Sequence, residues 1–162
     1  MAESSRFCTF LSMQISHAAI ASEAAASREA VTALLRDLIA TPSLSTAEGA
    51  VTDRLAYEAR ELGADDVIID ERGNFVARFG SGPRTLLFDS HIDTVDVGDR
   101  AEWSRDPFDP YMERSATGNI IHGRGASDNK AGIASMLHGA SLWRRIDPSD
   151  DVSLWVVGSV QE

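Results

Sequence analysis

Three short segments place a histidine or a carboxylate directly after an apolar run or a glycine-rich turn. His91 and Asp93 follow one apolar run, Asp128 follows a turn rich in glycine, and Glu162 follows a second apolar run. Open α/β sheets carry their sites where strands end, so these side chains are candidates for one site. Imidazole and carboxylate groups bind divalent metal ions, and both can move protons.

The spacing of His91 and Asp93 allows the carboxylate to orient the imidazole. In extended backbone, residues i and i+2 face the same side, so Asp93 can accept a hydrogen bond from the ring nitrogen that does not face a metal. Such a bond fixes the tautomer and the basicity of a metal-binding histidine. The alternative is that His91 is a core histidine satisfied by its surroundings.

Asp128 lies in the segment 123–132, where small residues let the backbone turn tightly before a predicted helix. Asp128 is either a metal ligand or an ordinary helix N-cap, which is a frequent role of aspartate in that position. A phosphate-binding loop is not predicted. The third glycine of the dinucleotide pattern and the Gly-Lys-Ser/Thr of the Walker pattern are both missing.

Glu162 stands just beyond the apolar run 155–157. A carboxylate past a buried strand is well placed as a general base, because burial makes it more basic. The alternative is a solvent-exposed terminal acid. A serine or cysteine hydrolase is not supported, since no Gly-x-Ser-x-Gly elbow occurs and the single cysteine, Cys8, lies in the amino-terminal tail.

Hydrophobic periodicity indicates the elements that would position these residues. Helical spacing of apolar residues predicts helices over 28–40, 46–62 and 130–145. Short apolar or alternating runs predict strands at 66–70, 74–79, 85–88, 120–122 and 153–157, with a loop-rich stretch at 95–118. The continuous run 85–88 is typical of a strand buried on both faces. The pattern favours an α/β fold with helices on both faces of a sheet.

Length and composition are those of one soluble domain, because the chain has 162 residues of which 43% are hydrophobic. The net charge of −10 argues against nucleic acid or an anionic membrane surface as the partner. One cysteine excludes an intrachain disulfide and favours a cytoplasmic protein. No signal peptide or membrane-spanning segment is predicted, and residues 1–27 are expected to form a disordered or frayed extension.

Taken together, these motifs resemble the M20 family of metallopeptidases and amidohydrolases, which includes acetylornithine deacetylase, succinyl-diaminopimelate desuccinylase and carboxypeptidase G2. The resemblance covers residues 28–162 and is carried by the segments Ser90–Asp93, Gly123–Gly132 and Val160–Glu162 and by the loop with Trp103, Pro107 and Phe108. His-Ile-Asp-Thr-Val and the Val-Gln-Glu ending are most similar to the YgeY-like branch, often described as selenium-metabolism hydrolases.

The resemblance implies a three-layer α/β/α zinc-exopeptidase-like domain with a mixed, mostly parallel sheet. It implies that His91 binds one metal ion, Asp128 bridges two, and Asp93 orients His91. Glu162 would be the general base. The two ions would be Zn²⁺, with Co²⁺ or Mn²⁺ as substitutes. The reaction would be amide hydrolysis of N-acyl amino acids or small peptides, and the full-length protein would be a homodimer.

Two features complicate this interpretation. Asn129 and Ala131 stand where family members often carry Met and Gly. The later ligands and the lid or dimerisation domain of the family would follow Glu162, so the chain would be the amino-terminal part of the catalytic domain. The alternative hypothesis is an inactive fragment with no catalytic function of its own.

Overall fold

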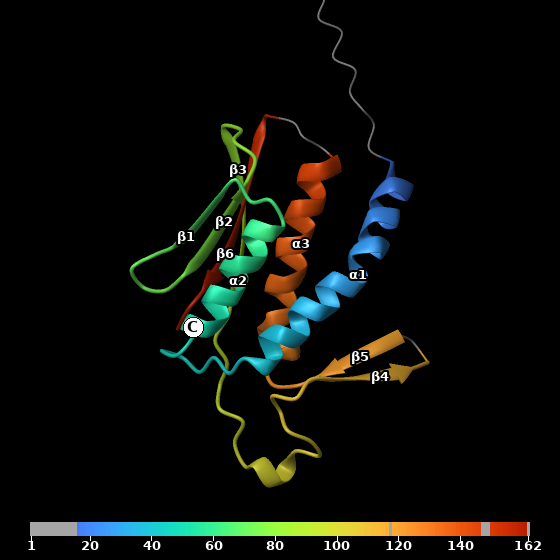
Figure 1. Cartoon of the computed structure of the whole chain (residues 1–162), viewed down its shortest axis with the longest axis vertical. Coiled ribbons are helices and arrows are strands. Elements are labelled where there is room, and N and C mark those ends of the chain that lie inside the picture. Colours follow the sequence, from blue (N-terminus) through green and yellow to red (C-terminus); the bar gives the residue numbers. More distant parts are fainter. Residues whose placement is uncertain (1–15, 117, 147–149, 162) are drawn as a thin grey trace, which may run out of the picture.

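The computed structural model describes residues 16–116, 118–146 and 150–161 (Figure 1). The helices are α1 (His17–Ala40), α2 (Gly49–Glu61) and α3 (Ala131–Ile146), and the strands are β1 (Asp66–Ile69), β2 (Phe75–Phe79), β3 (Arg84–His91), β4 (Tyr111–Ser115), β5 (Gly118–His122) and β6 (Val152–Ser159). A short 3₁₀ helix (Arg100–Glu102) and a kinked turn (Ala126–Lys130) complete the elements. The α/β class expected from the sequence is confirmed.

Four strands form one sheet in the order β1-β2-β6-β3, and β4 and β5 form a separate hairpin. In the four-stranded sheet, β2 is antiparallel to both β1 and β6, whereas β3 is parallel to β6. The sheet is therefore mixed, as expected, but within its four described strands only the β3–β6 pairing is parallel. The long connection from β3 to β6 contains the loop 92–110, the hairpin and α3.

The hydrophobic core lies between the sheet and the helices. Phe75, Ala77 and Phe79 of β2 and Leu154 and Val156 of β6 are buried, because alternate residues of a strand face the same side. α2 contacts β1 and β2, α3 contacts β2, β3 and β6, and α1 packs on α3. Figure 1 shows α2 and α3 in front of the sheet. A second helical layer on the opposite face is not present among the described residues.

β3 departs from the expected burial. The run Leu86–Phe88 was predicted to be covered on both faces, yet Leu86, Leu87 and Phe88 are 49%, 56% and 39% exposed. The reason is the position of β3 at the edge of the sheet, where β6 is its only strand partner in the described part of the chain. An apolar run thus predicted the strand correctly and its burial wrongly.

The first helix is longer than the sequence indicated. α1 begins at His17, with Ser16 as its N-cap, so residues 17–27 are helical rather than part of a frayed extension; residues 1–15 lie outside the described part. This segment is rich in alanine, a strong helix former, but its exposed surface carries no apolar stripe to reveal the period. The hairpin strand β4 was also missed, inside the stretch predicted as loop.

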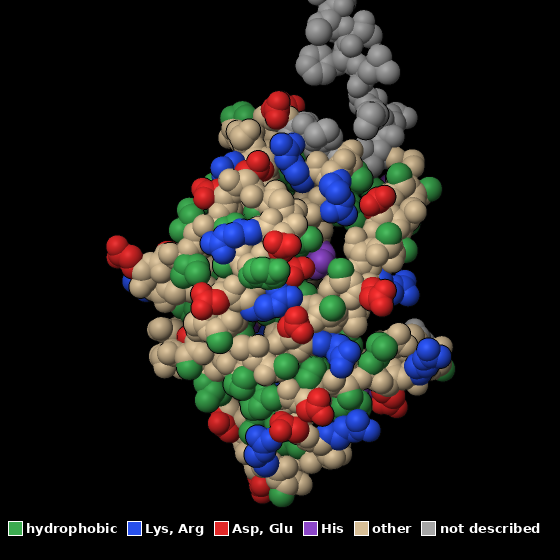
Figure 2. All heavy atoms as spheres, in the orientation of Figure 1, with side chains coloured by type: hydrophobic (Ala, Val, Ile, Leu, Met, Phe, Trp, Pro, Cys, Tyr) green, Lys and Arg blue, Asp and Glu red, His purple; other side chains and the backbone are tan. Residues whose placement is uncertain are grey.

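The surface shows no basic patch on the face in Figure 2. Arg side chains are interspersed with Asp and Glu over the helices, which fits the acidic composition. None of the described helices is long and apolar enough to cross a membrane.

Candidate metal site

His91 is the last residue of β3, and Asp93 follows it two positions later at the same end of the sheet. Pairing with β6 continues to the last residue of the strand, where His91 lies opposite Ser159. The Ile92 N–H then donates to the Ser159 carbonyl at 2.9 Å, and the Ile92 side chain is fully buried. This anchor fixes the backbone between the two polar residues.

The two side chains face the same region, as the i, i+2 spacing predicts. Nδ1 of His91 lies 3.5 Å from Oδ1 of Asp93 and 3.2 Å from the Asp93 carbonyl oxygen. The Asp93 side chain is 5% exposed and the His91 side chain 14%. A proton on Nδ1 can be donated to the Asp93 carbonyl oxygen, with the Asp93 carboxylate close beside it, and Nε2 then lies on the outer side of the ring.

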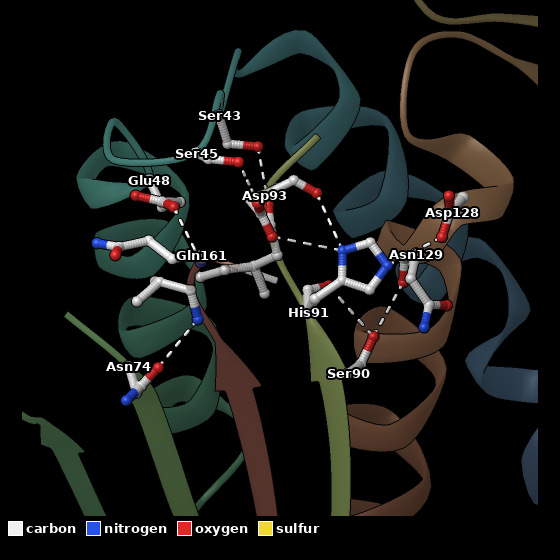
Figure 3. Close-up of polar contacts among 12 residues, drawn as sticks. Ser43, Ser45, Glu48, Asn74, Ser90, His91, Asp93, Asp128, Asn129 and Gln161 are labelled. Atoms are coloured by element: carbon white, nitrogen blue, oxygen red, sulfur yellow. Dashed lines mark hydrogen bonds and ion pairs between the residues drawn. The ribbon is translucent and has the colours of Figure 1, made fainter. Parts of the chain in front are cut away.

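Asp128 faces that outer nitrogen. Its Oδ1 lies 2.9 Å from His91 Nε2 (Figure 3), and its side chain is 89% exposed. Asp128 precedes α3 in non-helical backbone (φ −134°, ψ 91°), and the peptide bond to Asn129 is cis. The Asp128 carboxylate points at the imidazole of His91.

A serine segment that sequence reasoning missed supports Asp93. The Ser45 hydroxyl donates to Asp93 Oδ2, and the Ser43 hydroxyl donates to the Ile92 carbonyl at 2.8 Å. The Thr94 N–H returns a bond to the Ser43 carbonyl at 2.7 Å. In the sequence these serines follow the end of a helix and look like any polar loop, so no signal marked them.

Two neighbouring cavities flank the 123–127 loop. A cavity of about 250 Å³ is lined by Ser45, His91, Asp93, Arg124 and Asp128 among others. A larger one of about 400 Å³ has aromatic walls, in which Tyr111 stacks on His122 with ring centroids 4.5 Å apart. Gly123, Ala126 and Ser127 border both cavities.

The donors present fit a divalent metal ion in type. His91 Nε2 and Asp128 Oδ1 are an imidazole nitrogen and a carboxylate oxygen, the ligands that suit zinc, and they meet at the rim of a cavity. Asp93 Oδ1, buried beside them, makes no hydrogen bond of its own. Among the described residues, however, no group of three or more His, Cys, Asp or Glu side chains is placed to hold an ion.

Glu162 lies outside the described residues, and its convergence with His91 and Asp128 stays a prediction. The residues before it are tied to neighbouring elements. The Val160 N–H donates to Asn74 Oδ1 at 2.9 Å, and the Gln161 N–H donates to Oε1 of the buried Glu48 at 3.3 Å. Neither Asn74 nor Glu48 was predicted to take part.

Lys130 is the second group that sequence reasoning did not place. Its side chain is fully buried, and its ammonium donates to the carbonyl oxygens of Leu38 and Thr41 at 2.7 and 2.8 Å. Burial lowers the pKa of Lys130 to about 8. The lone lysine of an arginine-rich chain was visible in the sequence, but its partners were not.

Comparison with solved structures shows that this α/β fold occurs in known proteins. The solved M20 family metallo-carboxypeptidase Sso-CP2 of Sulfolobus solfataricus superposes with a TM-score of 0.71 at 23% identity, over 82% of this chain and 31% of that one. Residues 87–162 match the description "Peptidase family M20/M25/M40". The chain is similar to members of this family over these residues.

Two relatives show how much of a known protein's length the chain matches. The uncharacterised protein YgeY of Escherichia coli K12 is 41% identical over 132 residues, which are 82% of this chain and 32% of YgeY. A succinyl-diaminopimelate desuccinylase of Methylocella silvestris is 38% identical over 109 residues, 63% of this chain and 27% of the enzyme. The chain thus spans about a third of the length of the relatives it matches.

Proposed function

We propose that this chain contributes His91 and Asp128 to a two-metal site that hydrolyses amide bonds in N-acyl amino acids or small peptides. One observation carries the proposal: the 2.9 Å contact between His91 Nε2 and Asp128 Oδ1 at the edge of the sheet. The types of both ligands agree with this role, and so does the position of His91 at the end of β3, which is parallel to β6.

The chain's own residues would prepare the site. Two divalent ions, when bound, would lower the pKa of a water molecule to about 7 and would polarise the carbonyl group of the amide. Asp93 holds the imidazole through Nδ1 so that Nε2 is presented, and Ser45 holds Asp93. The exposed carboxylate of Asp128 offers two oxygens, which suits a bridging ligand.

Proton transfer is assigned to Glu162 by the resemblance to the family. In this proposal its carboxylate takes a proton from the attacking water and returns it to the leaving amine, the usual double role of one general base. Gln161, its neighbour in the chain, is bonded to the buried Glu48. That bond would help to position the base.

The proposed substrate class comes from the relatives and from the size of the cavities. One relative is named as a desuccinylase and one structural neighbour as a metallo-carboxypeptidase, and both names describe cleavage of amide bonds. The two cavities of about 250 and 400 Å³ lie side by side, which suits a small substrate that spans the reacting bond. The dimeric state and the cytoplasmic location of a full-length protein are part of the same proposal.

The alternative is that the 162-residue chain has no catalytic function of its own. The absence of a group of three or more metal-binding side chains in the described part favours this alternative. A competent two-metal site needs several ligands for each ion. Both hypotheses share the metal-binding role of His91 and Asp128 and differ in turnover.

Cobalt titration followed by visible absorption tests the shared part. We expect weak Co²⁺ binding by the wild-type chain, lost in His91→Ala and in Asp128→Ala. His122→Ala is the matched control, because His122 pairs with Glu113 at 3.0 Å in the hairpin. Equal cobalt spectra for the wild type, His91→Ala and Asp128→Ala would show that these residues do not bind the ion.

A further inference from the structure

We propose that Lys130 is a positioning residue: its buried ammonium fixes the Asp128 loop to the end of α1 and thereby sets Asp128 against His91. This inference rests on the proposed function of His91 and Asp128. It assigns to the only lysine of the chain a role that none of the motifs required.

The first half of the connection is the loop that carries Asp128. The Lys130 N–H donates to the Gly125 carbonyl at 3.0 Å, which closes the turn around Asp128 and Asn129. The stem of Lys130 lies against Gly125, where an added Cβ would be 3.3 Å from Lys130 Cδ. Gly125 has a φ of +76°, so it provides both the turn and the room for the stem.

The second half is the end of α1. The last carbonyls of a helix lack partners within the helix and carry the negative end of its dipole, so an ammonium is favourable there. Lys130 Nζ binds the carbonyls of Leu38 and Thr41 at 2.7 and 2.8 Å. These charge-assisted bonds offset the cost of burying the cation.

The end of α1 leads directly into the serine segment that holds β3. Ser43 binds the backbone of Ile92 and Thr94, and Ser45 binds Asp93. Lys130 is therefore bonded to the same stretch of backbone that fixes the His91 side of the site. Through the end of α1, the Lys130 side chain links the Asp128 loop to the serine segment that holds Asp93 beside His91.

The test uses Lys130→Met, which keeps the length of the stem and removes the ammonium. Ser141→Ala is the matched control, because the Ser141 hydroxyl donates to the Leu62 carbonyl at 2.9 Å and so ties α3 to the end of α2. Both variants lose a bond from a buried side chain to the end of a helix. Only Lys130 is connected to the Asp128 loop.

Two measurements read the outcome on the full 162-residue chain. Long-range ¹H–¹⁵N NMR of the metal-free chain reports on the His91 ring, and we expect its signals to shift in Lys130→Met but not in Ser141→Ala. Calorimetric titration with Co²⁺ measures the affinity of each variant. We expect Lys130→Met to bind Co²⁺ at least about tenfold more weakly than the wild type and Ser141→Ala to bind it with wild-type affinity.

Folded Lys130→Met with unchanged His91 signals and unchanged Co²⁺ affinity would overturn the inference and leave the proposed function intact. Shifted His91 signals in Lys130→Met, together with no Co²⁺ binding by the wild type, would sustain the positioning role and refute the metal site.

If Lys130→Met does not fold, Lys130→Arg is measured instead, because the longer guanidinium side chain can reach the same carbonyls only if the loop moves. Unchanged His91 signals in Lys130→Arg would then overturn the inference.

Discussion

His91 Nε2 lies 2.9 Å from Asp128 Oδ1, although 37 positions separate the two residues in the chain. The two carboxylates around this imidazole differ in setting, since the Asp93 side chain is 5% exposed and the Asp128 side chain 89%. A buried carboxylate with a serine partner holds a ring in place, whereas an exposed one remains open to a further ligand. The arrangement fits the proposed roles, in which Asp93 orients the ring and Asp128 binds the metal ion.

Replacing Asp93 by alanine should weaken metal binding roughly 10 to 100-fold, because the imidazole loses the carboxylate that orients it. Isothermal titration with Zn²⁺ gives the affinity. Asp96→Ala is the control, since Asp96 is exposed and its carboxylate accepts from the Gly98 N–H. In a full-length protein the hydrolytic rate should fall with the affinity. Wild-type affinity in Asp93→Ala would refute the orienting role.

The sequence predicted the parts of the site that depend on local spacing. His91 and Asp93 face the same region because they stand two positions apart in extended backbone, and that relation needs no tertiary information. The approach of Asp128 was expected from the ends of strands and turns. The sequence could not supply the partners from elsewhere in the chain, such as Ser45, Glu48 and the acceptors of Lys130, since hydrogen bonds between distant residues leave no periodic pattern.

Burial was harder to predict than the elements themselves. Leu86, Leu87 and Phe88 read as a central strand, but the place of a strand in a sheet depends on which other strands pair with it. The helical segment 17–27 was missed for the opposite reason, because it has propensity without an apolar stripe. Hydrophobic periodicity reveals a helix only where one face of it is buried against another element. It therefore does not reveal an exposed helical segment such as 17–27.

Two glycines of α3 should respond to alanine in opposite ways. At Gly132 a Cβ would lie 2.5 Å from Asn129 Oδ1 and 3.1 Å from Ser90 Oγ, so Gly132→Ala should destabilise by about 1–3 kcal/mol through overpacking. At Gly139 a Cβ would meet nothing within 4 Å, and Gly139→Ala should stabilise by about 0.5–1 kcal/mol through helix propensity. Urea unfolding measures both. Equal changes in the two variants would mean that the loop beside Gly132 yields freely.

Stability should decrease as the pH falls below about 6.5, in part because of His138. Burial lowers the pKa of His138 from its ordinary value of 6.5, and the nearby Glu58, 3.4 Å away, opposes this shift without cancelling it. The unfolded chain then takes up the proton at a higher pH than the folded chain. The contribution of neutral His138 to the free energy of unfolding is fully present above pH 6.5. It is lost as the pH falls through the pKa of His138 in the folded chain.

Urea unfolding of His138→Gln at pH 7.5, 6.5 and 5.5 checks this expectation. The variant should lose less stability than the wild type over that range, because glutamine does not titrate. His17→Gln, at the exposed start of α1, is the control. Parallel pH profiles for the wild type and His138→Gln would exclude His138 as the source of the decrease.

The 162-residue chain on its own should bind zinc weakly and should not hydrolyse N-acetyl amino acids. Each ion of a two-metal site needs several ligands, and the proposed ligands among the described residues are the imidazole of His91 and the carboxylate of Asp128. With so few donors, an attacking water would be neither held nor made acidic, and Glu162 would have no activated proton to accept. The assay compares the purified chain with a full-length relative at several Zn²⁺ and Co²⁺ concentrations, and Glu162→Gln serves as the control for contaminating activity. Turnover close to that of the relative, abolished by Glu162→Gln, would show that fewer ligands suffice than the chemistry of such sites demands.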